Sequence, residues 1–157
     1  MVFFHNPNEE NGIYSNWYLS DFTIDGILYS SMEQYMMYQK ALLFQDQDIA
    51  DRILDISDVA RIKDLGRAVR NYNDIVWAGL RQIIVYKGLL AKFSQNAGLK
   101  NALLSTGDQV MAECAVEDTI WGIGLSMRDE RRFDMAQWRG QNLLGFSLME
   151  VRRCLKC

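Results

Sequence analysis

The segment from residue 22 to residue 44 constrains the fold most, because it predicts a strand pair that leads directly into a capped helix. Residues 22–29 alternate around Asp25-Gly26, a dipeptide typical of two-residue hairpin turns. Ser30 precedes Glu33 by three residues and Ser31 precedes Gln34 by three, so either serine can cap the helix that follows. A hairpin joined to a helix excludes a purely helical bundle.

The rest of the chain predicts mainly helices. Apolar residues recur at spacings of three and four from Ile75 to Phe93 and predict a long central core helix. Shorter helices are expected after Asp46, after Ser57 or Asp58, at residues 99–104 and after Asn142, with a buried strand at 110–115. The sequence therefore predicts a mainly α, α+β fold with a small β-sheet or hairpin, and one domain over residues 1–157.

The scarcity of histidine limits the chemistry. The only histidine is His5, near an N-terminus expected to be frayed, so Ser-His-Asp triads, Cys-His pairs and His-rich metal sites are disfavoured. Three cysteines do not form a secreted disulfide framework. We expect no metal and no cofactor. Carboxylate and lysine chemistry remains, and it suits cleavage of glycosidic bonds.

Charge and hydropathy bear on partners and location. The net charge of −3 gives no basic field that would hold nucleic acid non-specifically, although it leaves room for a local contact with one modified nucleotide. No apolar run reaches membrane-spanning length, and no N-terminal signal segment is visible. We therefore expect a soluble, cytoplasmic protein that makes no contact with a membrane.

Glu33 and Lys40 are the first candidate catalytic pair. At 3.6 residues per turn, Glu33, Met37 and Lys40 project within roughly 20° to 60° of one another on one helix face. A carboxylate and an amine are then aimed in the same direction. The alternative is a solvated surface pair, with Glu33 only completing a capping box.

Asp118, the third candidate catalytic residue, forms a second candidate cluster with Trp121, Gly122 and Gly124. A tryptophan face can stack on a heterocycle, paired glycines let backbone N–H groups approach a phosphate, and a carboxylate can bind a ribose hydroxyl. The cluster lacks the third glycine of a dinucleotide-binding motif. A core tryptophan beside a simple turn is the alternative.

Further binding candidates are Gly140 and Asn142 at the start of the last helix, where free N–H groups can hold an anion, and Asn16 and Trp77. Simple capping by Asn142 and a core position for Trp77 are the alternatives. Together, these clusters favour a phosphorylated ribosyl ligand.

Six stretches resemble the NADAR (YbiA-like) family in order and spacing, and they cover the chain from about residue 16 onward. They are residues 25–41 (DGILYSSMEQYMMYQKA), 65–67 (LGR), 91–93 (AKF), 104–107 (LSTG), 118–124 (DxxWGxG) and 140–152 (GxNxxGxxLMxxR). The resemblance implies a YbiA-like helical domain that hydrolyses N-glycosidic bonds, with Glu33, Lys40, Asp118, Trp121, Gly122 and Asn142 at motif positions.

Two activities are associated with this family. One branch removes ADP-ribose from guanine in nucleic acid, often opposite an ADP-ribosylating toxin, and the other cleaves phosphoribosylamino-pyrimidine intermediates of riboflavin synthesis. Gln34 stands where the riboflavin branch typically has histidine, and residues 126–139 form a longer polar loop with four arginines. Both departures favour the ADP-ribosyl branch, with ADP-ribosylated DNA or RNA as substrate. A non-catalytic module that binds NAD or ADP-ribose is the remaining alternative.

Overall fold

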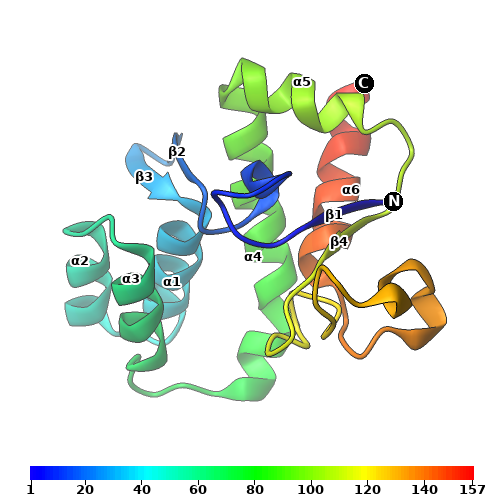
Figure 1. Cartoon of the computed structure of the whole chain (residues 1–157). Helices are drawn as coiled ribbons and strands as arrows, with labels where there is room; N and C mark the ends of the chain where they lie inside the picture. Colours follow the sequence, from blue (N-terminus) through cyan, green and yellow to red (C-terminus); the bar gives the residue numbers. More distant parts are fainter. The chain divides into compact units, whose positions relative to one another are not determined.

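The hairpin and the first helix are present in the computed structural model, which describes residues 1–157 (Figure 1). Strand β2 (Leu19–Ile24) pairs antiparallel with β3 (Ile27–Ser31). Asp25 and Gly26 have φ values of 51° and 80°, the positive values that a tight hairpin turn of this kind requires. Helix α1 (Met32–Leu43) begins at Ser31, whose side chain accepts a hydrogen bond from the Gln34 N–H at 3.1 Å.

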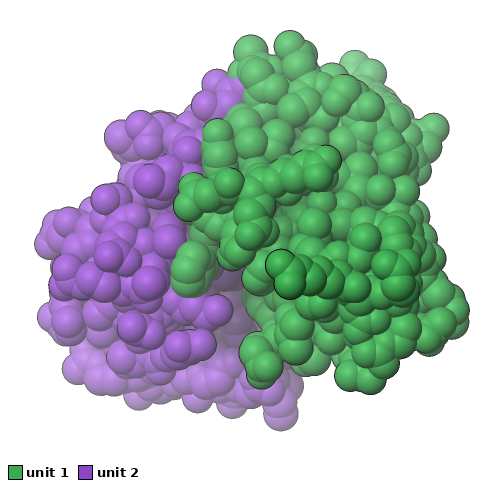
Figure 2. Space-filling view, viewed as in Figure 1, with its two compact units in different colours: residues 1–18, 97–157 green, residues 19–96 purple.

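The chain divides into two units, which Figure 2 colours separately: residues 19–96, and residues 1–18 with 97–157. The first unit holds the hairpin, α1 and three further helices: α2 (Gln47–Leu54), α3 (Val59–Arg67) and α4 (Asp74–Gln95). The second holds β1 (Val2–Phe4), η1 (Gly12–Tyr14), α5 (Ala97–Ser105), β4 (Met111–Glu113), η2 (Glu130–Phe133), η3 (Met135–Gln137) and α6 (Leu143–Lys156). The mainly α, α+β class is confirmed.

The N-terminal segment differs from the expectation of a frayed end. Strand β1 pairs in parallel with β4, with Phe4 opposite Glu113, and the Phe4 side chain is fully buried. The fold therefore has two separate two-stranded sheets rather than one. Sequence periodicity did not reveal β1 because a three-residue strand is too short to show alternation, and its partner lies more than 100 residues away.

Helix α1 is the centre of the unit formed by residues 19–96. It packs against α2, α3 and α4, and an aromatic cluster of Phe22, Tyr29 and Tyr35 joins it to the hairpin with ring centroids 5.1 to 6.0 Å apart. Eight of its twelve residues are buried. Few residues of α1 therefore face the solvent, and its polar residues Glu33 and Gln34 are buried as well.

The contact between α1 and α4 depends on Gly88. A Cβ at this position would lie 2.4 Å from Cδ1 of Tyr35 and 2.8 Å from Cε of Met32, both of which are buried. Gly88 lies on the buried face of α4. Ile75 and Ile83, expected in the core, are 83% and 65% exposed, and Trp77, Arg81 and Val85 are buried instead. The expectation for the first half of α4 was wrong because its apolar residues occur all around the helix.

We predict opposite effects of two glycine substitutions in α4. Gly88→Ala should lower the free energy of unfolding by about 1–3 kcal/mol, because the new methyl group overlaps a buried aromatic ring. Gly79→Ala should raise it by about 0.5–1 kcal/mol, because no atom lies within 4 Å of the added Cβ and alanine favours the helix. Urea denaturation of both variants checks this. Equal effects would contradict the packing at Gly88.

Lys92 is a fully buried lysine on the same inner face of α4. Burial lowers its pKa from 10.5 to about 7, because the charged ammonium loses its hydration. The unfolded chain keeps the proton up to about pH 10, whereas the folded protein releases it near pH 7. Between these values the unfolded state binds more protons, so a rise in pH favours the folded state.

The free energy of unfolding should therefore increase from pH 7 to pH 9, and the increase should be smaller in a Lys92→Met variant. The window ends at pH 9 because burial raises the pKa of Cys114 to about 11, which has the opposite effect at higher pH. Denaturation curves at several pH values for both proteins measure the two slopes. Identical slopes would show that Lys92 keeps its proton in the folded state.

No helix is both long enough and apolar enough to span a bilayer, α4 included.

Candidate active site

Glu33 and Lys40 of helix α1 are both shielded from solvent, Glu33 more than Lys40. Glu33 is 4% exposed and Lys40 is half-buried, so neither is the freely solvated surface residue of the alternative interpretation. Gln34, between them in sequence, does not share their direction. Its amide accepts from Ser30 N and donates to the carbonyl oxygens of Ile53 and Ile56. Gln34 thus ties α1 to the end of α2, and the departure from histidine at this position has a structural use.

The Lys40 amine lies among groups that hold a cation. Its Nζ donates a hydrogen bond of 2.7 Å to the carbonyl oxygen of Gly66, and lies 4.5 Å from the ring centroid of Tyr72 and 5.8 Å from that of Trp77. Gly66 can supply this carbonyl because it has no side chain: a Cβ there would lie 1.9 Å from Sδ of Met37. The close approach of α3 to α1 therefore fixes the amine.

The pKa of Lys40 lies below its ordinary value of 10.5, chiefly because the amine is partly desolvated. The carboxylate of Glu33 opposes this shift, Arg67 adds to it, and Asp74 opposes it more weakly. Glu33 is thus close enough to influence the protonation of Lys40. An amine with a lowered pKa can give or take a proton, or act as a nucleophile, closer to neutral pH.

Titration of Lys40 by NMR, followed through its Cε and Nζ signals, should give a pKa below 10.5. In a Glu33→Gln variant the pKa should fall further, because the carboxylate that favours the ammonium is removed. The exposed Lys87 serves as an internal control in both spectra. A Lys40 that titrates at or above 10.5 would contradict the burial described above.

The segment before α4 carries Tyr72, and an ion pair anchors this segment. The buried Asp46 carboxylate caps α2 and accepts hydrogen bonds from the backbone N–H, Nε and Nη2 of Arg70 at 2.6 to 3.1 Å. These bonds hold the pKa of Asp46 well below its usual range. The Tyr72 ring packs on Phe44, and its hydroxyl donates to Asp74 at 2.7 Å. The ring is thereby held beside Lys40.

The sequence did not indicate Tyr72 or Arg81 as candidate site residues. Tyr72 precedes α4 in an irregular segment, so periodicity does not mark it. Arg81 follows Trp77 by one helical turn and is buried. A charged residue at a buried helix position can indicate a functional site. The apolar pattern of α4 predicted a different buried face, so Arg81 was not recognised as such a residue.

In the unit formed by residues 1–18 and 97–157, Asp118 and Trp121 lie in one turn. Oδ1 of Asp118 accepts hydrogen bonds from the N–H groups of Ile120 and Trp121 at 2.9 and 2.8 Å. Both side chains are half-buried. Asp118 therefore shapes the turn that presents Trp121, through one of its two carboxylate oxygens.

Gly122, Gly124 and Gly140 are packed tightly against backbone. A Cβ on Gly140 would lie 2.2 Å from the Gly122 carbonyl oxygen, a Cβ on Gly122 would lie 2.8 Å from the Glu113 carbonyl oxygen, and Gly124 has a φ of 69°. Larger residues cannot occupy these positions without moving the chain. The turn geometry alone accounts for these glycines. A role for them in phosphate binding stays a prediction.

Asn142 is fully buried and bonded to the neighbouring strand. Its Oδ1 accepts from the N–H of Glu113 at 3.1 Å, and its Nδ2 donates to the Met111 carbonyl oxygen at 2.9 Å. It makes no side-chain cap bond at the start of α6, and its φ is 53°. The amide therefore joins β4 to α6, and a bond from it to a ribose hydroxyl stays a prediction.

Asn16 in the same unit is 6% exposed, and its Oδ1 has no hydrogen-bond partner. An unsatisfied buried acceptor is costly, and such groups are found at binding sites. This observation supports the prediction that Asn16 contacts a ligand.

The loop of residues 126–139 is not uniformly basic. Arg131 forms an ion pair with Asp129 at 2.6 Å, and the guanidinium of Arg132 lies over the rings of Phe3 and Phe133. Arg128 and Arg139 are exposed and form no salt bridge. Two arginines are thus available for an anion.

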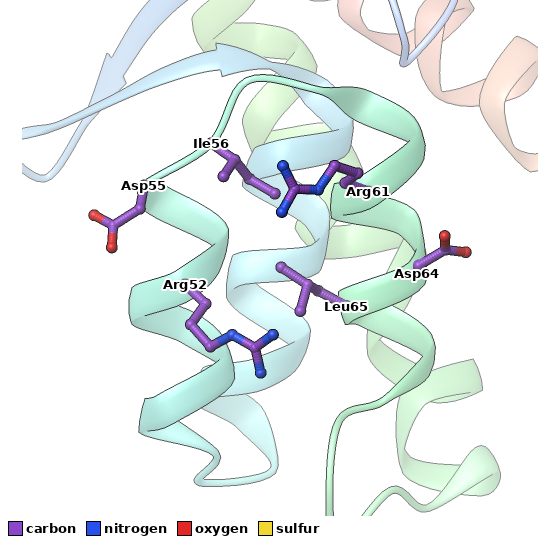
Figure 3. Close-up of a pocket in the computed structure, with 6 residues that line it drawn as sticks. All are labelled: Arg52, Asp55, Ile56, Arg61, Asp64 and Leu65. Atoms are coloured by element: carbon purple, nitrogen blue, oxygen red, sulfur yellow. The ribbon is translucent and has the colours of Figure 1, made fainter.

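Figure 3 shows a pocket of about 400 Å³ between α2 and α3 that contains none of the predicted site residues. The guanidinium groups of Arg52 and Arg61 lie between the two helices, and Asp55 and Asp64 point outward. This pocket contains neither the buried Glu33 nor the half-buried Lys40 of α1. Elsewhere, no three His, Cys, Asp or Glu side chains gather in a way that could hold a metal ion.

A mainly helical α+β fold and a buried glutamate with a half-buried lysine on one helix define the class, and the comparisons with known proteins agree with it. The sequence profile of the NADAR domain matches residues 2–156, so the chain belongs to the NADAR family. The match spans both units.

Relatives of this chain are named as enzymes. The N-glycosidase R617 of Acanthamoeba polyphaga mimivirus is 41% identical over 159 residues, 96% of this chain and 94% of that protein. The N-glycosidase YbiA of Escherichia coli (strain K12) is 27% identical over 99% of this chain and 88% of its own length. These relatives place the chain among the N-glycosyl hydrolases.

Two further comparisons bear on fold and substrate. The NMR structure of E. coli YbiA is similar with a TM-score of 0.81 and 27% identity, over 99% of this chain and 84% of that one. The riboflavin biosynthesis protein VVA0006 of Vibrio vulnificus is 30% identical over 99% of this chain, which corresponds to 38% of that protein. The YbiA-like fold is confirmed.

Proposed function

We propose that this enzyme hydrolyses the N-glycosidic bond between ADP-ribose and guanine in nucleic acid. The observation that carries the proposal is the Glu33–Lys40 pair: a buried carboxylate and a partly desolvated amine on one helix, beside two aromatic rings. Glycoside hydrolysis needs a base for water and an acid for the leaving group. The pair supplies both without metal or histidine.

The proposed reaction follows from the bond that breaks. The carboxylate of Glu33 accepts a proton from water, and the water oxygen bonds to the anomeric carbon. The bond from that carbon to the guanine nitrogen breaks as its electron pair moves to the nitrogen, which takes a proton from the Lys40 ammonium. Glu33 also stabilises the positive charge that builds on the ribose. Tyr72 and Trp77 keep the amine in place by cation–π contact.

Glu33→Gln should slow the release of ADP-ribose from an ADP-ribosylated guanine oligonucleotide by about 10²–10⁴-fold, because a neutral amide cannot take the proton. Chromatography of the released ADP-ribose measures the rate. A Glu10→Gln variant, which changes an exposed glutamate, should retain the wild-type rate. A folded Glu33→Gln protein with most of its activity would remove Glu33 from the mechanism.

Lys40 has a second possible role, as a nucleophile. Its neutral amine would attack the anomeric carbon, expel the base and leave an imine with the opened sugar, which water then hydrolyses. Borohydride added during turnover would reduce that imine to a stable adduct on Lys40, detectable by mass spectrometry. Loss of activity in Lys40→Ala without any adduct in the wild type would assign Lys40 as the acid.

We propose substrate contacts for Asn16, Asp118 and Trp121. Asn16 has an unpaired acceptor, Asp118 has a carboxylate oxygen outside its turn, and Trp121 offers a partly exposed ring. Gly122, Gly124, Gly140 and Asn142 support these groups by shaping the backbone. Substitutions of Asn16 and Trp121 should raise KM more than they lower kcat.

Hydrolysis of phosphoribosylamino-pyrimidine intermediates is the second candidate, and the name of the Vibrio vulnificus relative favours it. The exposed Arg128 and Arg139 favour a larger anionic substrate and thus the nucleic-acid reaction. Both substrates should be offered to the same preparation. Cleavage of the pyrimidine compound alone would select the second candidate, and binding of ADP-ribose without any cleavage would select a non-catalytic module.

If ADP-ribosylated nucleic acid is the substrate, an ADP-ribosylating toxin would be the functional counterpart, and the reaction would take place in the cytoplasm. Co-expression with such a toxin gives a direct test: the wild type should rescue growth and Glu33→Gln should not.

A further inference from the structure

Arg81 is a buried cation that the mechanism does not use. Its side chain is 8% exposed on the inner face of α4. Its Nε is buried without any hydrogen-bond partner, and the guanidinium forms no ion pair. A guanidinium remains charged at any physiological pH, so a carboxylate or another anion usually compensates its burial. The fold supplies no such partner here.

The position of Arg81 relates it to the group around Lys40. It follows Trp77 by one helical turn, about 6 Å along the axis of α4, and both residues are on the buried face. The ring of Trp77 lies near Lys40, and the charge of Arg81 acts on the ionisation of Tyr72. Trp77 and Tyr72 therefore relate Arg81 to the surroundings of Lys40.

The nearby acidic groups form no ion pair with Arg81. Asp74 accepts the hydrogen bond of the Tyr72 hydroxyl, and the charges of Glu33 and Asp74 both act on Lys40. Arg67 adds a positive charge to the field at Lys40. A planar guanidinium with unused donors matches the oxygens of a phosphate group, which it can bind in a bidentate manner.

We infer that Arg81 binds a phosphate group attached to the ribose of the substrate, and so selects phosphorylated ribosyl compounds. The inference rests on the proposed function. Two sources carry this chemistry: the diphosphate of ADP-ribose and the 5′-monophosphate of a phosphoribosylamine. In either case the anion would supply the partner that Arg81 lacks and would hold the sugar relative to Glu33 and Lys40.

Calorimetric binding tests this inference without any bond cleavage. Wild-type protein and Arg81→Gln are titrated with ADP-ribose, ribose 5-phosphate and unphosphorylated adenosine. The variant should lose roughly 10- to 100-fold in affinity for a phosphorylated ligand, as expected for a hydrogen-bonded charge pair, and should bind adenosine as the wild type does. Loss for ADP-ribose alone identifies the diphosphate, and loss for both phosphorylated ligands identifies the phosphate nearest the ribose.

Two further variants complete the experiment. Arg61→Gln removes an exposed arginine of α3 and should change nothing. Arg81→Lys keeps the charge but loses the planar pair of donors, so it should recover part of the affinity; it also decides the matter if Arg81→Gln does not fold. In kinetics with the phosphorylated substrate, Arg81→Gln should raise KM more than it lowers kcat.

Three results would overturn the inference: unchanged affinity in Arg81→Gln, an equal loss for adenosine, or no binding of phosphorylated ligands by the wild type. The first two would mean that solvent satisfies Arg81 and that its role is structural. Failure of the proposed function is distinguishable, because a wild type that cleaves neither substrate can still bind ADP-ribose through Arg81.

Discussion

The close approach of α1 to its neighbouring helices is the constraint on which the candidate site depends. At Gly66 and Gly88 the absence of a side chain lets α3 and α4 come near enough to touch Met37 and Tyr35. Without the first contact, the carbonyl that accepts the Lys40 hydrogen bond would lie further away. Without the second, α4 would lie further from α1. Two glycines outside the chemistry thus permit the close packing around Lys40 and along α4.

The resulting group places charges where water is scarce. Burial of Glu33 and partial burial of Lys40 strengthen their interaction. Desolvation of the amine lowers the pKa of Lys40, and the charge of Glu33 opposes that shift. Such an arrangement reduces stability, as an unpaired Arg81 and a fully buried Lys92 also do. Perturbed and poorly compensated charges are typical of functional sites rather than of a core selected for stability alone.

In the unit formed by residues 1–18 and 97–157, side-chain hydrogen bonds and close backbone packing hold irregular segments in one conformation. Asp118 bonds the N–H groups of its own turn, Asn142 bonds both polar groups of β4 that face it, and Gly122 and Gly140 pack backbone on backbone. These residues belong to the stretches that resemble the family, and their bonding shows that they shape the backbone of this unit.

The sequence by itself determined the local features: the Asp25-Gly26 hairpin, a serine cap at Ser30 or Ser31, the cap at Asp46, the mainly helical α+β class and the shared direction of Glu33 and Lys40. These depend on neighbours within one or two turns. Only the tertiary structure decided the parallel pairing of β1 with β4, the exposure of Ile75, the place of Tyr72 beside Lys40 and the burial of Arg81. Each of these depends on contacts between distant segments, and the periodicity of a single segment carries no information about such contacts.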